Sequence, residues 1–84
     1  MYATVYPNPA SEDNFNVRII SVDNLTPIRL QIIDLRGEVY FDDLLNGGTN
    51  YDRKIVPEIS MPEGLYFMLV QQGDLVKRSK VIIR

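Results

Sequence analysis

Leu65-Tyr66-Phe67-Met68-Leu69-Val70 is an uninterrupted apolar segment between two turns. Met61-Pro62-Glu63-Gly64 precedes it, with proline at the second and glycine at the fourth position of a reverse turn, and Gln72-Gly73-Asp74 follows it as a hairpin turn. A short apolar segment bounded by turns is typical of a strand that is buried on both faces. The segment therefore predicts a central β-strand.

The sequence on either side of this strand alternates apolar and polar residues with a period of two. Phe15-Asn16-Val17-Arg18-Ile19 and Ile28-Arg29-Leu30-Gln31-Ile32 are the clearest examples, and no window of about 11 residues sustains a helical stripe. Short strands separated by turns predict an all-β fold, an immunoglobulin-like antiparallel β-sandwich of about seven strands. The other strands are expected at residues 3–6, 39–41, 51–55 and 75–83.

The expected core takes the apolar members of these alternating pairs. The chain lacks the cysteines and tryptophan that a strict immunoglobulin-superfamily domain would usually carry. The residues predicted to face the core are Phe15, Val17, Leu30, Ile32, Val39, Leu65, Phe67 and Leu69.

The segment Pro7-Asn8-Pro9 interrupts the pattern near the N-terminus. Two prolines offer no N–H groups to a hydrogen-bonded ladder, and Pro9 restricts Asn8 to extended geometry. We therefore expect a stiff, non-repetitive lead-in after a short strand at residues 3–6.

Length and composition place the 84 residues in a single domain, residues 1–84, with a modest core. No apolar run approaches the roughly 18 residues of a membrane-spanning helix, so no transmembrane segment is expected. Met1 is followed by polar and turn residues, with no basic and apolar leader. If the protein is exported, its signal is expected upstream, on a larger protein of which this chain is the terminal module.

The net charge of −2 is unevenly distributed. Residues 74–84 carry four basic and one acidic side chain, whereas residues 1–73 carry five basic and ten acidic ones. The acidic balance argues against nucleic acid as a partner. The basic C-terminal strand is interpreted either as an edge protected against aggregation or as a recognition feature.

Catalysis is not expected. The chain contains no histidine and no cysteine, which removes the usual general base, the Ser–His–Asp and Cys–His arrangements and the commonest metal ligands. Asp42 and Asp43 are adjacent on a predicted strand, so their carboxylates point to opposite faces. No catalytic residue, metal ligand or cofactor is assigned.

Two binding functions remain as alternatives, each as an accessory β-sandwich of an extracellular enzyme. Glu12-Asp13-Asn14 and Asp23-Asn24 offer oxygen ligands for calcium, although such loops commonly form turns through their own side chains. Tyr40, Tyr51 and Tyr66 could stack on sugar rings. Tyr40 and Tyr66 have apolar neighbours, which favours half-buried core positions with hydroxyls at the rim.

Four segments together resemble a known family, the C-terminal sorting domains of the type IX (Por) secretion system of Gram-negative bacteria. They are Tyr6-Pro7-Asn8-Pro9-Ala10, a hairpin Ile33-Asp34-Leu35-Arg36-Gly37-Glu38-Val39, the turn Met61-Pro62-Glu63-Gly64-Leu65-Tyr66 and the terminal Lys80-Val81-Ile82-Ile83-Arg84. They occur in the family's order over nearly the whole chain, with methionine in place of leucine at position 61. The motif positions are Pro7, Asn8, Pro9, Asp34, Gly37, Pro62, Gly64 and Tyr66.

The resemblance implies a function as a secretion and sorting signal. Such domains end large secreted cargo proteins and direct them from the periplasm across the outer membrane, to the cell surface or the medium. The implied partners are the N-terminal cargo domain of the parent protein, the type IX translocon and a sortase-like surface peptidase that removes the domain and anchors the cargo. An exposed terminal strand would offer backbone groups for strand addition. Recognition is therefore expected at Lys80, Val81, Ile82, Ile83 and Arg84.

Overall fold

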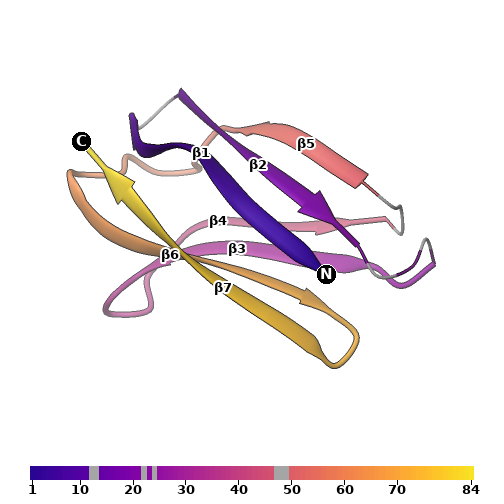
Figure 1. The fold of residues 1–84 in the computed structure, drawn as a ribbon. Helices are drawn as coiled ribbons and strands as arrows, with labels where there is room; N and C mark the ends of the chain where they lie inside the picture. The colour runs from indigo at the N-terminus through magenta and orange to yellow at the C-terminus, as the bar shows by residue number, and fades with distance from the viewer. Residues whose placement is uncertain (12–13, 22, 24, 47–49) are drawn as a thin grey trace.

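The computed structural model describes residues 1–11, 14–21, 23, 25–46 and 50–84. This part of the chain is all-β (Figure 1). The strands are β1 (Tyr2–Ser11), β2 (Asn14–Ile20), β3 (Ile28–Asp34), β4 (Val39–Leu45), β5 (Asn50–Ile55), β6 (Gly64–Gln72) and β7 (Leu75–Ile83). No helix that could cross a membrane occurs in the described ranges.

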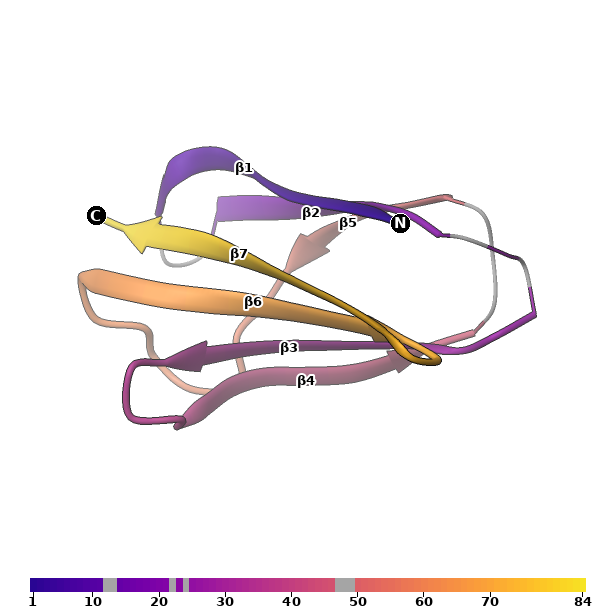
Figure 2. The same cartoon turned by 60° about the horizontal axis from the view of Figure 1, so that its bottom comes forward.

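The strands form one sheet in the order β4-β3-β6-β7-β1-β2-β5, which folds over into two layers. Figure 2 shows β1, β2 and β5 in one layer and β7, β6, β3 and β4 in the other. Neighbouring strands are antiparallel except β1 and β7, which run parallel at the pair Ala10↔Ile83. The predicted seven-stranded sandwich is confirmed, with this parallel contact as an addition.

The outer strands of this order, β4 and β5, are linked across the open side of the sandwich. A guanidinium nitrogen of Arg53 on β5 lies 3.7 Å from a carboxylate oxygen of Asp43 on β4. The N–H of Glu58, just after β5, donates to the carbonyl of Tyr40 on β4 at 2.9 Å. The sheet is thus nearly closed.

The core lies between the two layers. Phe15 and Val17 of β2 face Leu30 and Ile32 of β3, and each is at most 1% exposed. Burying a side chain of this size contributes about 1.5–3 kcal/mol. These four core predictions are confirmed. The other fully buried side chains include Ile19, Ile28, Ile55, Met61, Met68, Val70 and Val81.

Strand β6 corrects the prediction of a strand buried on both faces. Tyr66, Met68 and Val70 point into the core, whereas Leu65 is 36% exposed and Phe67 and Leu69 are partly exposed on the other face. The reason is that the sandwich has two layers, and no strand of the described chain packs against the outer face of β6. The predicted inward positions of Leu65, Phe67 and Leu69 were therefore wrong.

Val39 is also outside the core, contrary to prediction, with 41% of its surface exposed. The register between β3 and β4 shifts between Ile32, which pairs with Phe41, and Ile33, which pairs with Val39. This bulge leaves Tyr40 opposite no residue of β3 and turns its ring inward, where it is 5% exposed.

Strand β1 continues through the proline segment instead of ending at residue 6. Its antiparallel pairing with β2 stops at Tyr6↔Asn16 and resumes at Ser11↔Asn14. Between these points Ala10 pairs with Ile83 of β7 instead. The prolines lie where the β1–β2 ladder is interrupted, so their missing N–H groups cost no bond to β2. The expected non-repetitive lead-in is thus an extended segment that moves from one layer to the other.

Candidate functional site

The four motif segments, which are far apart in the sequence, meet at one end of the sandwich (Figure 1). Asp34, at the end of β3, pairs with Tyr66 of β6. Gly64, at the start of β6, pairs with Ile83 of β7, and Ile83 pairs on its other side with Ala10 of β1. Register alone therefore joins all four segments into one surface.

Asn8 connects the proline segment to the C-terminal strand through its side chain. The carboxamide nitrogen donates to the carbonyl of Lys80 at 2.9 Å, and the carboxamide oxygen accepts from the N–H of Ile82 at 3.1 Å. Two residues later the carbonyl of Ala10 accepts from the N–H of Arg84 at 2.8 Å. The outer edge of β7, the edge that faces away from β6, is thus closed along residues 80–84: its backbone groups there are already hydrogen-bonded to β1.

The loop after β3 is organised by Asp34. One of its carboxylate oxygens accepts from the N–H groups of Arg36 (2.8 Å) and Glu38 (3.0 Å), and the other lies 3.2 Å from the Arg36 guanidinium. Gly37 has a φ of 86°, a left-handed conformation that favours glycine. Burial raises the pKa of Asp34, but the hydrogen bonds from Glu38 and Arg36 outweigh it and lower the pKa overall.

Two buried tyrosines connect this loop to the turn before β6. The rings of Tyr40 and Tyr66 meet edge to face with centroids 5.1 Å apart. The hydroxyl of Tyr40 donates to Asp34 at 3.1 Å, and the hydroxyl of Tyr66 donates to the carbonyl of Pro62. Burial, followed by the hydrogen bond to Asp34, raises the pKa of Tyr40. The loop and the turn are therefore held as one unit.

Between the loop and the turn lies an open groove of about 360 Å³. Asp34, Arg36 and Tyr40 line one side, and Pro62 and Tyr66 line the other. Asp34 and both tyrosine hydroxyls are engaged in the bonds just described, whereas the side chain of Arg36 is 79% exposed at the rim. The groove is thus built by residues that fix the backbone of this end of the domain.

These motif segments, and their order along the chain, decide the family. A family model for the secretion system C-terminal sorting domain matches residues 4–84. The chain belongs to this family. A search of curated protein sequences found no significant match. The family is one of type IX sorting signals and not of catalysts, which implies interaction with the type IX secretion machinery and with a cargo region.

In this sorting domain the five candidate recognition residues divide by their orientation. Val81 and Ile83 are buried at 0% and 3% exposure and anchor β7 in the core. Lys80 and Arg84 are exposed and Ile82 is 37% exposed, so these three present their side chains outward. The expectation of an open backbone edge at residues 80–84 was wrong, because Asn8 and Ala10 occupy it.

Of the candidate calcium ligands, Asp23 is described by the structure, and its contacts give no support to a metal site. Residues 12, 13 and 24 and the side chain of Asn14 lie outside what the structure describes. The carboxylate of Asp23 accepts from the N–H groups of Thr26 (2.7 Å) and Leu25 (2.8 Å) and from the Thr26 hydroxyl (3.0 Å). Asp23 thus closes its own turn. Among the described residues no group of three or more acidic side chains is placed to hold a metal.

The tyrosines proposed as a sugar platform do not form one exposed surface, because Tyr51 lies apart from the buried pair Tyr40 and Tyr66. Tyr40 and Tyr66 are 5% and 4% exposed, so their faces are covered by the core. Tyr51 lies on β5, with the Arg53 guanidinium 5.7 Å from its ring centroid. The interpretation of Tyr40 and Tyr66 as core residues with hydroxyls near the rim is the correct one.

Sequence reasoning missed two contributors to this end of the domain. Tyr40 was interpreted only as a core residue with its hydroxyl at the rim, and its hydrogen bond to Asp34 was not expected, because the bulge that turns its ring inward has no signature in the apolar–polar alternation. Asn8 was recognised only as a motif position. The flanking prolines could have indicated the role of Asn8. They lack N–H groups, so backbone groups of a neighbouring strand need a side chain as their hydrogen-bond partner.

Proposed function

We propose that this sorting domain is the terminal module of a larger secreted protein and that the outward side chains of its C-terminal strand are read by the type IX translocon. Family membership supports the sorting role. The observation that carries the recognition part is the arrangement of β7, in which Val81 and Ile83 anchor the strand while Lys80, Ile82 and Arg84 remain outside. A machine that accepts many cargoes needs such a constant, self-contained surface.

The later steps follow from the family resemblance. A sortase-like surface peptidase removes the domain and links the cargo to a lipopolysaccharide anchor, so that the cargo is found at the cell surface or in the medium. The domain is a sorting signal and the substrate of this peptidase; it performs no catalysis and needs no cofactor. The contacts of Asp23, Tyr40 and Tyr66 do not favour the alternative of an accessory calcium- or glycan-binding module.

The test is export of a reporter that carries a Sec signal peptide and is fused in front of this domain, in a host with the type IX machinery. Lys80→Ala should leave the reporter in the periplasm, whereas Lys54→Ala, the same change on β5, should not. Both sites are exposed, so each substitution should change the free energy of unfolding by no more than about 0.5 kcal/mol. Thermal melts of the purified domains check this.

Deletion of residues 80–84 is a poor test, because it also removes the buried side chains of Val81 and Ile83. Arg84→Ala and Ile82→Ala complete the series without disturbing the core. Normal export of all three variants would contradict recognition at this strand. The turn at residues 62–66 and the segment Pro7-Asn8-Pro9 would then be the next candidates.

A further inference from the structure

The outer edge of β7 is closed at one end of the strand and open at the other. The groups bonded at the closed end are the carbonyl of Lys80 and the N–H groups of Ile82 and Arg84. All three belong to even-numbered residues. Because β7 pairs with β6 without a bulge, the groups of Val76 and Arg78 point to the same side.

No strand among the described residues covers this side of residues 75–78. Ala10↔Ile83 is the one ladder pair that joins β1 to β7 in the described chain, and the hydroxyl of Ser79, bonded to the carbonyl of Ala3 at 3.3 Å, marks where β1 comes near. Beyond it the hairpin of β6 and β7 diverges from β1 (Figure 2). Leu75 and Val76 are 46% and 59% exposed, and Lys77 and Arg78 are exposed as well.

The open part of β7 is nevertheless a formed strand. Its other edge is paired with β6 at Gln72↔Leu75, Gln71↔Val76, Val70↔Lys77 and Leu69↔Arg78. Arg78 is held in place further, with its guanidinium 5.6 Å from the centroid of the Phe67 ring. A fixed strand with free N–H and C=O groups along one edge is a template for an added strand.

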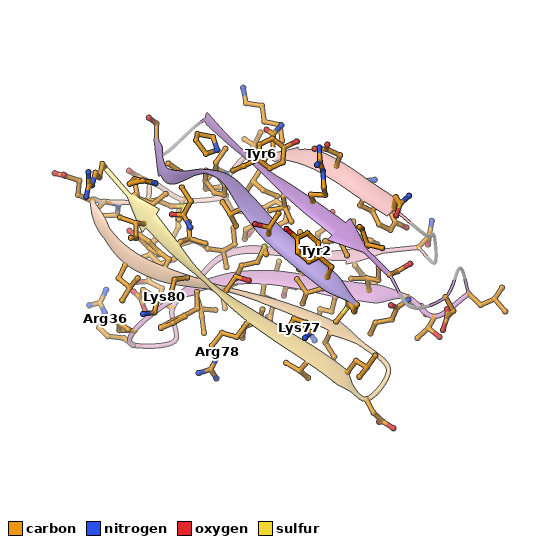
Figure 3. The ribbon with its side chains drawn as sticks, viewed as in Figure 1. Tyr2, Tyr6, Arg36, Lys77, Arg78 and Lys80 are labelled. Carbon is orange, nitrogen blue, oxygen red and sulfur yellow. The ribbon has the colours of Figure 1, made fainter. Side chains whose placement is uncertain are left out.

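The basic side chains beside this edge favour a negatively charged partner strand. Lys77 and Arg78 are consecutive on β7, so their side chains lie on opposite faces of the sheet. Figure 3 labels both residues on this strand. A strand added here meets a cation on each face, and from residue 64 to residue 84 the sequence has one acidic side chain, Asp74. Opposite charges on neighbouring strands stabilise pairing and like charges oppose it.

We propose that the open edge of β7, along residues 75–78, binds an acidic polypeptide segment in extended conformation as an additional strand. A second copy of this chain fits less well, because pairing two such edges brings Lys77 and Arg78 of both copies together. An anionic membrane would attract the same cations but leave the N–H and C=O groups of the edge without partners. The site is separate from the outward side chains of residues 80–84 and does not depend on the proposed sorting function.

The direct test uses the 84-residue chain and a short capped peptide in which glutamate alternates with valine. Two-dimensional amide NMR should show shifts concentrated at residues 75–80, and hydrogen exchange of the amides of Val76 and Arg78 should slow. The same peptide with lysine in place of glutamate should give neither effect. Vesicles of phosphatidylglycerol serve as the membrane probe, and light scattering monitors self-association.

Two substitutions separate charge from backbone pairing. Lys77→Glu should weaken binding of the glutamate peptide by about fivefold, whereas Lys54→Glu, which changes the net charge equally, should leave it unchanged. Val76→Pro removes one outward N–H and should abolish strand addition while keeping the ladder with β6, because proline is tolerated at a strand edge. The amide spectrum of β6 verifies that ladder.

Peptide shifts at residues 75–80 that respond to Lys77→Glu and not to Lys54→Glu establish the site. Shifts confined to another surface overturn the proposal, and so does the absence of any shift up to the solubility limit of the peptide. Binding of vesicles but not of the peptide overturns it in favour of a membrane. Self-association through this edge overturns it in favour of a second copy. If Val76→Pro unfolds the domain, comparison of peptide binding by Lys77→Glu and Lys54→Glu still decides whether the site lies at this edge.

Discussion

The side chain of Asn8 takes the place of a peptide group. A carboxamide carries one acceptor oxygen and one donor nitrogen, the same pair that a residue of a neighbouring strand would present to β7. Pro7 and Pro9 have no N–H to offer, so the backbone on either side of Asn8 cannot serve as a donor. The side chain bonds Lys80 and Ile82 instead. Of the residue types that could stand between these prolines, only asparagine and glutamine carry both groups.

Asn8→Asp tests this interpretation with nearly constant shape. The carboxylate keeps an acceptor for the N–H of Ile82 but turns a second oxygen toward the carbonyl of Lys80, so we expect a loss of about 1–3 kcal/mol in the free energy of unfolding at neutral pH. Denaturant titrations measure it, with Asn46→Asp at another exposed asparagine as the control. Relative to the parent chain, part of the loss should return below about pH 4, where the carboxyl regains a proton. Equal losses in both variants would contradict the role of Asn8.

At the level of the element, the sequence predicted where strands lie better than which way they face. β2 and β3 alternate apolar and polar residues, which defines the inward face, and Phe15, Val17, Leu30 and Ile32 are buried as expected. β6 is apolar on both faces, so the pattern contains no information on orientation. Its inward face is set by its register with β3 and β7, which arises only in the folded chain.

Truncation of neighbouring side chains on β6 measures its orientation. Met68 is 0% exposed, so Met68→Ala should cost about 2–5 kcal/mol through lost burial and an internal cavity. Leu69 is partly exposed on the outer face, so Leu69→Ala should cost less than half as much. Chemical denaturation of both variants gives the ranking. The reverse ranking would restore the prediction that Leu69 faces the core.

For the whole molecule, the motifs predicted the family and the turn spacing predicted the sandwich, but neither predicted the shape of the site. That site depends on contacts between residues distant in sequence, such as Asn8 with Lys80 and Ile82. It also depends on β1 moving between layers, so that the C-terminal strand is closed at residues 80–84 and open before them. Period and composition do not report such long-range geometry, because they describe only neighbours along the chain.

The free energy of unfolding of the whole domain should fall in acid, because folding lowers the pKa of four carboxylates. The pKa of Asp23 is lowered by N–H groups of Thr26 and Leu25, that of Asp42 by Arg29, and that of Asp52 by Tyr6 and then Arg18. Asp34 belongs with them, because the N–H groups of its loop outweigh burial. A folded pKa below the unfolded one gives stability that is complete above about pH 5, where the unfolded carboxyl is also ionised, and that is lost as the pH falls through the folded value.

Unfolding free energies measured by denaturant titration between about pH 6 and pH 2 test this linkage. We expect a plateau above about pH 5 and a steady decline below pH 4. Asp34→Asn should flatten the decline, because the substituted amide has no proton to take up, and it should lower the plateau by removing the Arg36 ion pair and weakening the bond from Tyr40. Asp74→Asn, which removes the same charge from the exposed β6–β7 turn, is the matched control. A decline of the same slope in the parent chain and in Asp34→Asn would show that Asp34 does not contribute to the acid sensitivity of the fold.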